Sequence, residues 1–287
     1  MPILGAHMSI VGGYYKAPQK AAELRMQCCQ IFTKNNNQWR AKPITPPEAE
    51  QFKQAVSDAG LLHPLAHDSY LINLAAPDDV LWRRSIDAFV EELERASLLG
   101  IPWVVTHPGA FTTGTEESGL QRIIAALDEV RQRTANVSAG CLLENTAGQG
   151  STLGARFEHL ATIIDGVRDA AWLGVCIDTC HVFAAGYPLA SLRDYRTTLR
   201  AMDTTFGLKL IKAVHVNDSV KPLGSHVDRH AHIGEGLIGL DAFRHLLNDE
   251  HFQNIPMYLE TPKGDRDGVD LDEINLATLR NLVDAAG

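Results

Sequence analysis

Eight short apolar segments recur along the chain, and a longer stretch of mixed polarity follows each of them. The segments are Ile3–His7, Cys28–Thr33, Leu62–His67, Trp103–His107, Cys141–Glu144, Leu173–Asp178, Leu210–His215 and Met257–Glu260. They end at residues 7, 33, 67, 107, 144, 178, 215 and 260, a spacing that fits βα units of roughly 30 residues or more. Eight such units predict an α/β fold, a single (β/α)8 TIM barrel that spans residues 1–287 as one domain.

The stretch between the third and fourth segments shows the helical pattern most clearly. Apolar residues recur there on one helical face, at Trp82, Ile86, Phe89, Val90 and Leu93. Gly100 follows and can supply the left-handed residue that ends a helix. An open, doubly wound sheet is the alternative architecture, but no Gly-x-Gly-x-x-Gly follows the first segment, which disfavours its dinucleotide-binding form.

Composition narrows the class of protein. Hydrophobic residues make up 45% of the chain, which is enough for a full core. The N-terminus lacks the features of a signal peptide, and no uncharged apolar run is long enough to span a bilayer, so we expect a soluble, cytoplasmic protein without a membrane partner. The five cysteines contain no Cys-x-x-Cys pair and are expected to be buried free thiols in a reducing compartment.

The net charge of −9 argues against a protein that holds nucleic acid by bulk positive charge. It is compatible with a local cationic site. Three bound divalent ions would bring the total to about −3, with the added charge concentrated at one place.

Six of the eight segments end on a residue that can bind a metal ion: His67, His107, Glu144, Asp178, His215 and Glu260. In a barrel of parallel strands these ends meet at the C-terminal mouth, where active sites lie. A lone histidine at a strand end is usually structural. Six polar ends at one mouth would be unfavourable without a shared partner, because buried polar groups need compensation. We therefore expect a metal cluster there.

Three further residues of ligand type stand close together in the sequence, namely His181 in Asp-Thr-Cys-His and Asp228 with His230 in Val-Asp-Arg-His. In an extended loop, alternate side chains point the same way, so the Asp-x-His pair can hold one ion. A salt bridge from Asp228 to Arg229 is the structural alternative. We expect the Cys180 side chain to face away. Five histidines and four carboxylates favour zinc over calcium or magnesium, with manganese an alternative for part of the site.

Four sequence blocks resemble the signatures of the endonuclease IV family: HDSYLINLAAP, LLENTAGQGSTLG, GVCIDTCH and GSHVDRHAHIGEG. The similarity runs from Gly-Ala-His near the start to Leu-Glu-Thr at 259–261. The Asp-Thr-Cys-His and Gly-Ser-x-x-x-Asp-Arg-His blocks are specific, whereas Gly-Ala-His alone would be weak.

The resemblance implies a trinuclear zinc centre. One ion would be held by His67, His107 and Glu144, a second by Glu144, Asp178, His215 and Glu260, and a third by His181, Asp228 and His230. Glu144 and Glu260 would be the catalytic carboxylates, the first as a bridge between two ions and the second as a ligand that orients the nucleophile. A metal-bridging hydroxide would cut the phosphodiester 5′ to an abasic site and leave a 3′-hydroxyl and a 5′-deoxyribose phosphate. Trimming of blocked 3′ ends by phosphodiesterase or phosphatase action would use the same centre.

Two loops resemble the DNA-reading elements of that family. The loop after the second segment contains Lys34, Asn37, Gln38, Trp39 and Arg40. The loop after the third contains Tyr70 and Leu71, which would enter the minor groove and fill the gap left by an extruded abasic nucleotide. Asn37 departs from the family pattern, which often has arginine two residues before the loop tryptophan, so this position supplies no charge to phosphate.

Two other functions compete with a DNA-repair nuclease that acts on double-stranded DNA. A metal-dependent sugar isomerase of the xylose-isomerase type would share a barrel with histidine and carboxylate ligands. The third ligand set and the polar loop after the second segment favour the nuclease over it. A non-catalytic zinc-binding module would need closed coordination, whereas shared carboxylates favour open positions. We expect the nuclease to act as a monomer.

Overall fold

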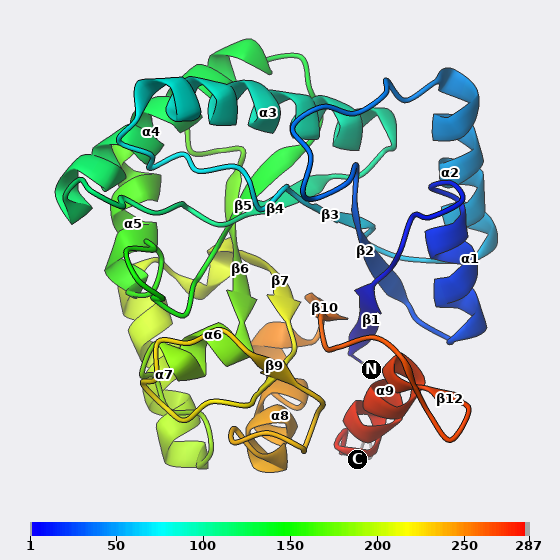
Figure 1. The fold of residues 1–287 in the computed structure, drawn as a ribbon. Coiled ribbons are helices and arrows are strands. Elements are labelled where there is room, and N and C mark those ends of the chain that lie inside the picture. The colour runs from blue at the N-terminus through cyan, green and yellow to red at the C-terminus, as the bar shows by residue number, and fades with distance from the viewer. Residues whose placement is uncertain (1, 285–287) are drawn as a thin grey trace.

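Eight parallel strands close on themselves in the computed structural model, which describes residues 2–284 (Figure 1). Around the barrel the order is β1-β10-β7-β6-β5-β4-β3-β2. Each barrel strand therefore lies beside the barrel strands that precede and follow it in the chain, and β10 closes the barrel against β1. Their bounds are β1 Ile3–His7, β2 Cys28–Phe32, β3 Leu65–His67, β4 Trp103–Thr106, β5 Gly140–Glu144, β6 Leu173–Asp178, β7 Ile211–His215 and β10 Pro256–Leu259. The predicted (β/α)8 barrel is confirmed, and the closed order excludes the open, doubly wound sheet.

Helices surround the strands, as Figure 1 shows. Their bounds are α1 Lys16–Glu23, α2 Pro46–Asp58, α3 Asp79–Leu98, α4 Glu116–Arg133, α5 Phe157–Gly166, α6 Thr179–Ala184, α7 Leu192–Thr205, α8 Leu240–Leu247 and α9 Leu271–Asn281, with short 3-10 turns at Leu208–Leu210 and Glu250–Phe252. Two small hairpins pair β8 Asp218–Ser219 with β9 His230–Ala231, and β11 Asp265–Arg266 with β12 Val269–Asp270. Among residues 2–284, no helix is both long and apolar enough to cross a membrane.

Helix α3 forms where the apolar periodicity predicts it. Asp78 accepts a hydrogen bond from the Leu81 amide and so caps the first turn. Ile86, Phe89 and Leu93 are each 0% exposed. After the helix, Gly100 adopts a φ of 72°, a left-handed conformation that glycine reaches without steric penalty. The predicted helix and its stop are both confirmed.

The third strand is shorter than predicted. We expect it to run from Leu62, but β3 begins at Leu65. His63 has a φ of 50°, which no β-strand residue adopts, and Pro64 has no N–H to donate to a neighbouring strand. Leu62 is 52% exposed as a result. The strand therefore starts only after these two residues.

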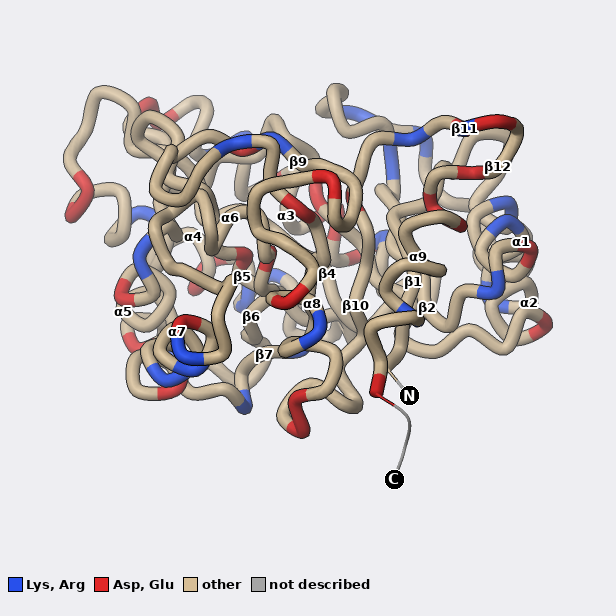
Figure 2. Tube along the Cα trace, turned by 90° about the horizontal axis from the view of Figure 1, so that it is seen from below, with Lys and Arg blue, Asp and Glu red and all other residues tan. Residues whose placement is uncertain are grey.

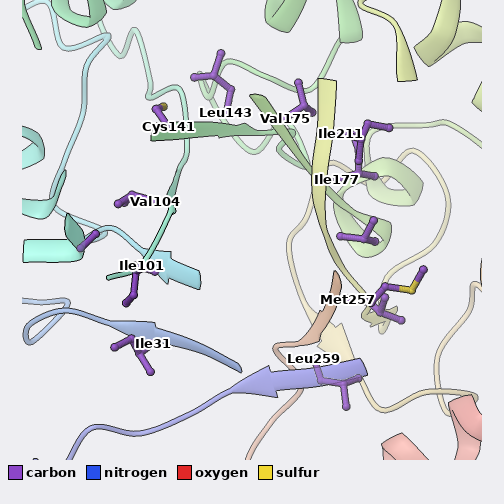
Figure 3. Close-up of a cluster of buried hydrophobic side chains, with 14 of the residues drawn as sticks. Ile31, Ile101, Val104, Cys141, Leu143, Val175, Ile177, Ile211, Met257 and Leu259 are labelled. Carbon is purple, nitrogen blue, oxygen red and sulfur yellow. The ribbon is translucent and has the colours of Figure 1, made fainter. Parts of the chain in front are cut away.

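Alternate strand residues point to opposite sides of the barrel wall. Those that face the helices form the main hydrophobic core, part of which Figure 3 shows with Val104, Leu143 and Val175 on the neighbouring strands β4, β5 and β6. Residues inside the barrel form a second apolar cluster, made of Cys28, Leu65, Val105, Leu142, Cys176, Ala213 and Tyr258. This second cluster closes the barrel interior beneath the C-terminal mouth.

All five cysteines are buried free thiols, as the sequence predicts. The charged residues outside the barrel are interspersed by sign over α1, α2, α5 and α7, as Figure 2 shows. The outer surface of these helices therefore presents no single-signed face.

Candidate metal centre

The C-terminal ends of the barrel strands bring the predicted ligands together. The six ligands of the barrel strands each lie two residues beyond an inward-facing apolar residue, and the pleat therefore turns their side chains into the barrel mouth. Glu144, Asp178 and His215 are each 0% exposed. His107 and Glu260 lie one residue beyond the last residues of β4 and β10. The side chain of His107 is 35% exposed, so the mouth opens on its side.

The first predicted set is assembled around one carboxylate oxygen. Glu144 Oε2 lies 3.1 Å from His67 Nε2 and 3.2 Å from His107 Nε2. The Nδ1 of His67 faces the other way and donates to the Asp68 carbonyl at 3.0 Å. These three side chains are close enough for their ligand atoms to share one ion.

The second set uses the other oxygen of the same carboxylate. Glu144 Oε1 lies 3.0 Å from His215 Nδ1, and Glu260 Oε2 lies 3.3 Å from the same nitrogen. Asp178 completes a group whose ligand atoms all lie within 4.8 Å of one another. Glu144 thus faces two ligand groups at once, one with each oxygen.

The third set lies beside helix α6 and the β8–β9 hairpin. Asp228 places one oxygen 3.2 Å from His181 Nε2 and the other 3.2 Å from His230 Nε2. Asp178 Oδ2 lies 3.5 Å from His230 Nε2, so this carboxylate stands between the second and third sets. Asp178 also caps α6 by accepting from the His181 amide, which fixes His181 relative to β6.

Cys180 departs from its prediction. We expect its side chain to face away, but its sulfur lies within 4.8 Å of ligand atoms of Asp228 and His230. The short helix α6 turns the thiol toward β9, where it donates to the Arg229 carbonyl at 3.7 Å. Burial raises the pKa of Cys180 to about 12, so the free thiol keeps its proton.

Charge complementarity holds this cluster together. Burial by itself raises the pKa of Glu144, but the facing His215 and His107 more than reverse this and hold that pKa well below its usual range. Burial lowers the pKa of His67, yet the contact with Glu144 dominates and raises it to about 9. The centre therefore favours ionised carboxylates and positive charge opposite them.

The geometry fits metal ligation better than a set of ordinary hydrogen bonds. The buried Nε2 atoms of His181 and His230 have no hydrogen-bond partner among the described residues, although Asp228 oxygens are 3.2 Å away. Two ligands about 2.0–2.1 Å from a tetrahedral zinc ion lie roughly 3.3–3.4 Å apart. Ligand atoms at that separation, aimed at a common point and not at each other, suit a bound cation.

Known proteins share both the sequence and the fold. The sequence model of the family described as Xylose isomerase-like TIM barrel matches residues 18–282. A protein of Chloroflexus aurantiacus named Probable endonuclease 4 is 49% identical over 286 residues and covers 100% of both chains. Another of that name from Citrifermentans bemidjiense is 46% identical and covers 99% of this chain and 100% of its own. The chain belongs to the endonuclease IV family.

The structural comparison supports this assignment and shows that the barrel fold alone does not identify the family. The crystal structure of endonuclease IV from Thermus thermophilus matches with a TM-score of 0.85 at 39% identity, over 98% of each chain. A D-tagatose 3-epimerase-like protein matches with a TM-score of 0.75 at 19% identity, over 98% of this chain and 97% of its own. Sugar-converting enzymes therefore share the fold, and sequence similarity is what separates the endonuclease IV family from them.

The family-like loop after β3 overhangs the centre. Tyr70 is 62% exposed, and its ring lies 5.6 Å from that of Phe32 and 6.1 Å from that of His67. Burial and the negative charges of the centre raise the pKa of Tyr70 to about 12. Leu71 follows and is partly buried. A large exposed side chain thus stands at the rim of the mouth.

The loop after β2 runs next to it. Ser69 Oγ donates to the Asn36 carbonyl at 2.6 Å and ties the two loops together. Asn37, Gln38 and Arg40 are exposed. Trp39 is partly buried against the core, and the Arg84 guanidinium lies 4.2 Å from its ring centroid. Trp39 therefore anchors this loop while its polar neighbours face solvent.

Lys34 is not on this surface. We expect it to reach DNA, but it is 4% exposed, and its Nζ lies 3.4 Å from Glu92 and 3.7 Å from Glu91. Both glutamates come from α3, so only the packing of that helix reveals the pairing. Lys34 supports the loop from beneath and presents no charge to a ligand.

Two further residues of the mouth, His7 and Gln30, are not predicted from the sequence as site residues. His7 is the last residue of β1, and Gln30 pairs with it from the middle of β2 and is 0% exposed. Their side chains contact each other and Glu260. Counting two residues on from the inward-facing Cys28 would have placed Gln30 in the mouth, but an amide does not signal a metal site.

Proposed function

We propose that this protein is a DNA-repair endonuclease that hydrolyses the phosphodiester 5′ to abasic sites in double-stranded DNA. The observation that carries the proposal is the convergence of three ligand sets on one barrel mouth, with Glu144 facing two of them. The products would be a 3′-hydroxyl and a 5′-deoxyribose phosphate. Trimming of blocked 3′ ends by phosphodiesterase or phosphatase action would use the same mouth, because it also breaks a P–O bond.

We assign the three sets to three zinc ions, with manganese an alternative for part of the site. Mixed histidine and carboxylate ligands suit zinc, whereas calcium and magnesium prefer oxygen alone. The chemistry that bound zinc supplies here is activation of water near neutral pH and stabilisation of negative charge on the phosphate and the leaving oxygen. Glu144 would help to hold both of the first two ions, because each of its oxygens faces a different ligand set.

The chain's own carboxylates would position the attack. Glu260 belongs to the second set, and its side chain is 19% exposed, which gives it access to the mouth. Its Oε1 is held by Gln30 at 2.6 Å, so the carboxylate has a defined orientation. We assign Glu260 to orienting the attacking water, and Glu144, which is 0% exposed, to holding the ligand sets in register.

The exposed rim would select the substrate. Tyr70 and Leu71 stand above the centre and would fill the space vacated by an abasic nucleotide that turns into the mouth. Extrusion of such a nucleotide requires little energy, because it has no base to unstack. Asn37, Gln38 and Arg40 would contact the DNA backbone beside the lesion, with Trp39 holding their loop in place. Positive charge localised at the centre would then attract phosphate to a chain whose net charge is −9.

An incision assay tests this function directly. Purified protein should cleave a duplex with one abasic site into a fragment that ends in a 3′-hydroxyl and should leave the undamaged duplex intact. Elemental analysis should find about three zinc ions per chain. Incubation of the same preparation with aldoses tests the sugar isomerase alternative. Isomerised sugar with intact abasic DNA, or full incision by protein that contains no metal, would overturn the proposal.

The remaining assignments extend this proposal. We propose that the enzyme acts in the cytoplasm on chromosomal DNA and as a monomer, because one chain supplies all three ligand sets. Light scattering of the zinc-loaded protein, alone and on abasic duplex, would test the monomer.

A further inference from the structure

Gln30 connects two ligands of the candidate metal centre from a strand that supplies none itself. Its side chain is fully buried in the middle of β2, where Gln30 pairs with His7 at the end of β1. Gln30 Nε2 lies 2.6 Å from Glu260 Oε1 and 2.9 Å from His7 Nδ1. Gln30 Oε1 lies 2.8 Å from His215 Nε2. All three partners face the barrel mouth.

The orientation of the Gln30 amide follows from its partners. An ionised carboxylate can only accept hydrogen bonds, so the amide nitrogen must face Glu260. The amide oxygen then faces His215, and because that oxygen can only accept, His215 Nε2 must donate. When a metal ion is bound, His215 would be neutral with its proton on Nε2 and would present the Nδ1 lone pair to the second ligand set. That Nδ1 is the atom 3.0 Å from Glu144 and 3.3 Å from Glu260.

His215 differs in this respect from three other histidines of the centre. These donate from Nδ1 to backbone carbonyls: His67 to Asp68 at 3.0 Å, His181 to Asn145 at 2.9 Å and His230 to Glu260 at 3.2 Å. No side-chain substitution removes a backbone carbonyl. His215 instead depends on a side chain, so its support can be removed by changing one residue.

We propose that Gln30 is a positioning residue for the second ligand set, where it fixes the ring orientation and tautomer of His215 and the orientation of Glu260. The proposal rests on the zinc centre of the proposed function. Outer partners of this kind hold a metal-binding histidine in the tautomer that leaves its inner nitrogen free to bind, and their loss commonly lowers metal affinity about 10–100-fold. Gln30 thereby gives β2 a role in the centre.

Gln30→Met tests the proposal because methionine has a similar shape but cannot form either hydrogen bond. We expect zinc bound at one site of the intact enzyme to be about 10–100-fold weaker, measured by competition with chelators of graded affinity. Incision at limiting zinc should fall in kcat with little change in KM for DNA, and excess zinc should restore it. The matched control is Gln27→Met, which removes a side-chain hydrogen bond to Leu4 at the opposite end of the barrel.

Gln30→Glu separates the tautomer effect from general disturbance of the barrel. Glutamate keeps an acceptor for His215 Nε2–H but replaces the donor to Glu260 with a carboxylate, so this variant should keep the His215 tautomer while it loses the support of Glu260. Nitrogen NMR of the His215 ring should show the proton on Nε2 in the wild-type protein and in Gln30→Glu. Wild-type zinc affinity in Gln30→Met, a His215 proton absent from Nε2 in the zinc-loaded wild type or in Gln30→Glu, or an equal loss in Gln27→Met would each overturn the proposal.

The wild-type protein in the same titration keeps this inference distinct from the proposed function. If the wild type binds zinc and cuts abasic DNA while Gln30→Met matches it, only the role of Gln30 fails. If the wild type binds no zinc, the metal centre itself fails, and the role of Gln30 fails with it.

Discussion

Two successive layers of side chains inside the same barrel differ sharply in chemistry. The layer at the C-terminal mouth consists of His7, Gln30, His67, His107, Glu144, Asp178, His215 and Glu260. The layer two residues earlier on the same strands consists of Gly5, Cys28, Leu65, Val105, Leu142, Cys176, Ala213 and Tyr258. Both layers are built on the same strands. A shift of two residues along each strand therefore separates a polar centre from an apolar core.

The lower layer explains how the upper one is tolerated. The lower layer combines large side chains such as Tyr258 and Leu142 with the small Ala213 and Gly5, and Gly5 is needed for closure. A Cβ on Gly5 would lie 1.9 Å from the Cys28 carbonyl oxygen, which is backbone and has nowhere to move. Burial of this apolar layer stabilises the barrel, whereas the upper layer concentrates polar groups that need one another or a cation. We therefore expect substitutions in the lower layer to change mainly stability and substitutions in the upper layer to change mainly activity.

The largest expected effect is on activity in the upper layer. Glu144→Gln removes the charge that faces two ligand sets, so we expect several kcal/mol of lost transition-state stabilisation, on the order of 10³-fold or more in kcat/KM. The circular dichroism spectrum should keep its barrel signature. Asp272→Asn is the matched control, because it neutralises a buried carboxylate that pairs with Lys263 outside the centre. Wild-type turnover by Glu144→Gln would contradict the bridging role.

The thiols of Cys29, which faces the helices, and Cys176, in the lower layer, should react very slowly with thiol reagents in the folded protein. Burial raises the pKa of Cys29 and of Cys176 to about 12 from an ordinary value of 9.0. At pH 8 the thiolate fraction of these residues should therefore be on the order of 10³-fold below that of a free thiol, and labelling should be slowed at least as much. A colorimetric thiol reagent measures the rate. The same protein in guanidinium chloride should react quickly, and fast labelling of the native protein would show that the layer opens.

A core substitution in the lower layer should change stability and leave the chemistry alone. Leu142 is 0% exposed and lies two residues before Glu144. Leu142→Ala should destabilise the fold by about 2–5 kcal/mol in denaturant unfolding, through lost burial and a residual cavity. The turnover of each folded molecule should stay near that of the wild type. Leu62→Ala, at a site that is 52% exposed, should change stability by less than about 0.5 kcal/mol.

A comparable loss of activity per folded molecule in Leu142→Ala would show that the two layers do not separate stability from function. The measurement needs both a denaturant titration and an active-site count, so that unfolded protein is not mistaken for slow enzyme.

The smallest effect concerns the rim above the upper layer. Asn37 is exposed, and each phosphate neutralised by a side chain adds roughly 0.9 to the slope of log affinity against log salt. Asn37→Arg should steepen the slope for abasic duplex by about this amount, while turnover at saturating DNA changes little. Asn254→Arg adds the same charge beside the N-terminal end of β10 and should leave the slope unchanged. Equal slopes in both variants would place residue 37 away from phosphate.

Much of the barrel could be predicted because its strands follow local patterns. All eight predicted segments contain barrel strands, and most of the ends agree within one residue. The predicted start of β3 at Leu62 is wrong. The prediction relied on the apolar side chain of Leu62, but the backbone of His63 and Pro64 cannot continue the strand to that residue. The two-residue strands β8 and β9 could not be predicted, because they pair residues 218–219 with 230–231 across a loop. The β11–β12 hairpin turns at Asp267-Gly268, a local turn signal that the segment analysis did not use.

The sequence by itself determined which residue types end the strands, since the β-period and the strand ends place six candidate ligands on one rim whatever their neighbours do. The tertiary structure alone decided how they combine. It showed that Glu144 faces two sets, that Asp178 stands between two sets, and that Gln30 supports His215 and Glu260 from a neighbouring strand. It also buried Lys34 against Glu92 of α3. These relations depend on distances between residues far apart in the chain, which only the closed barrel and its surrounding helices fix.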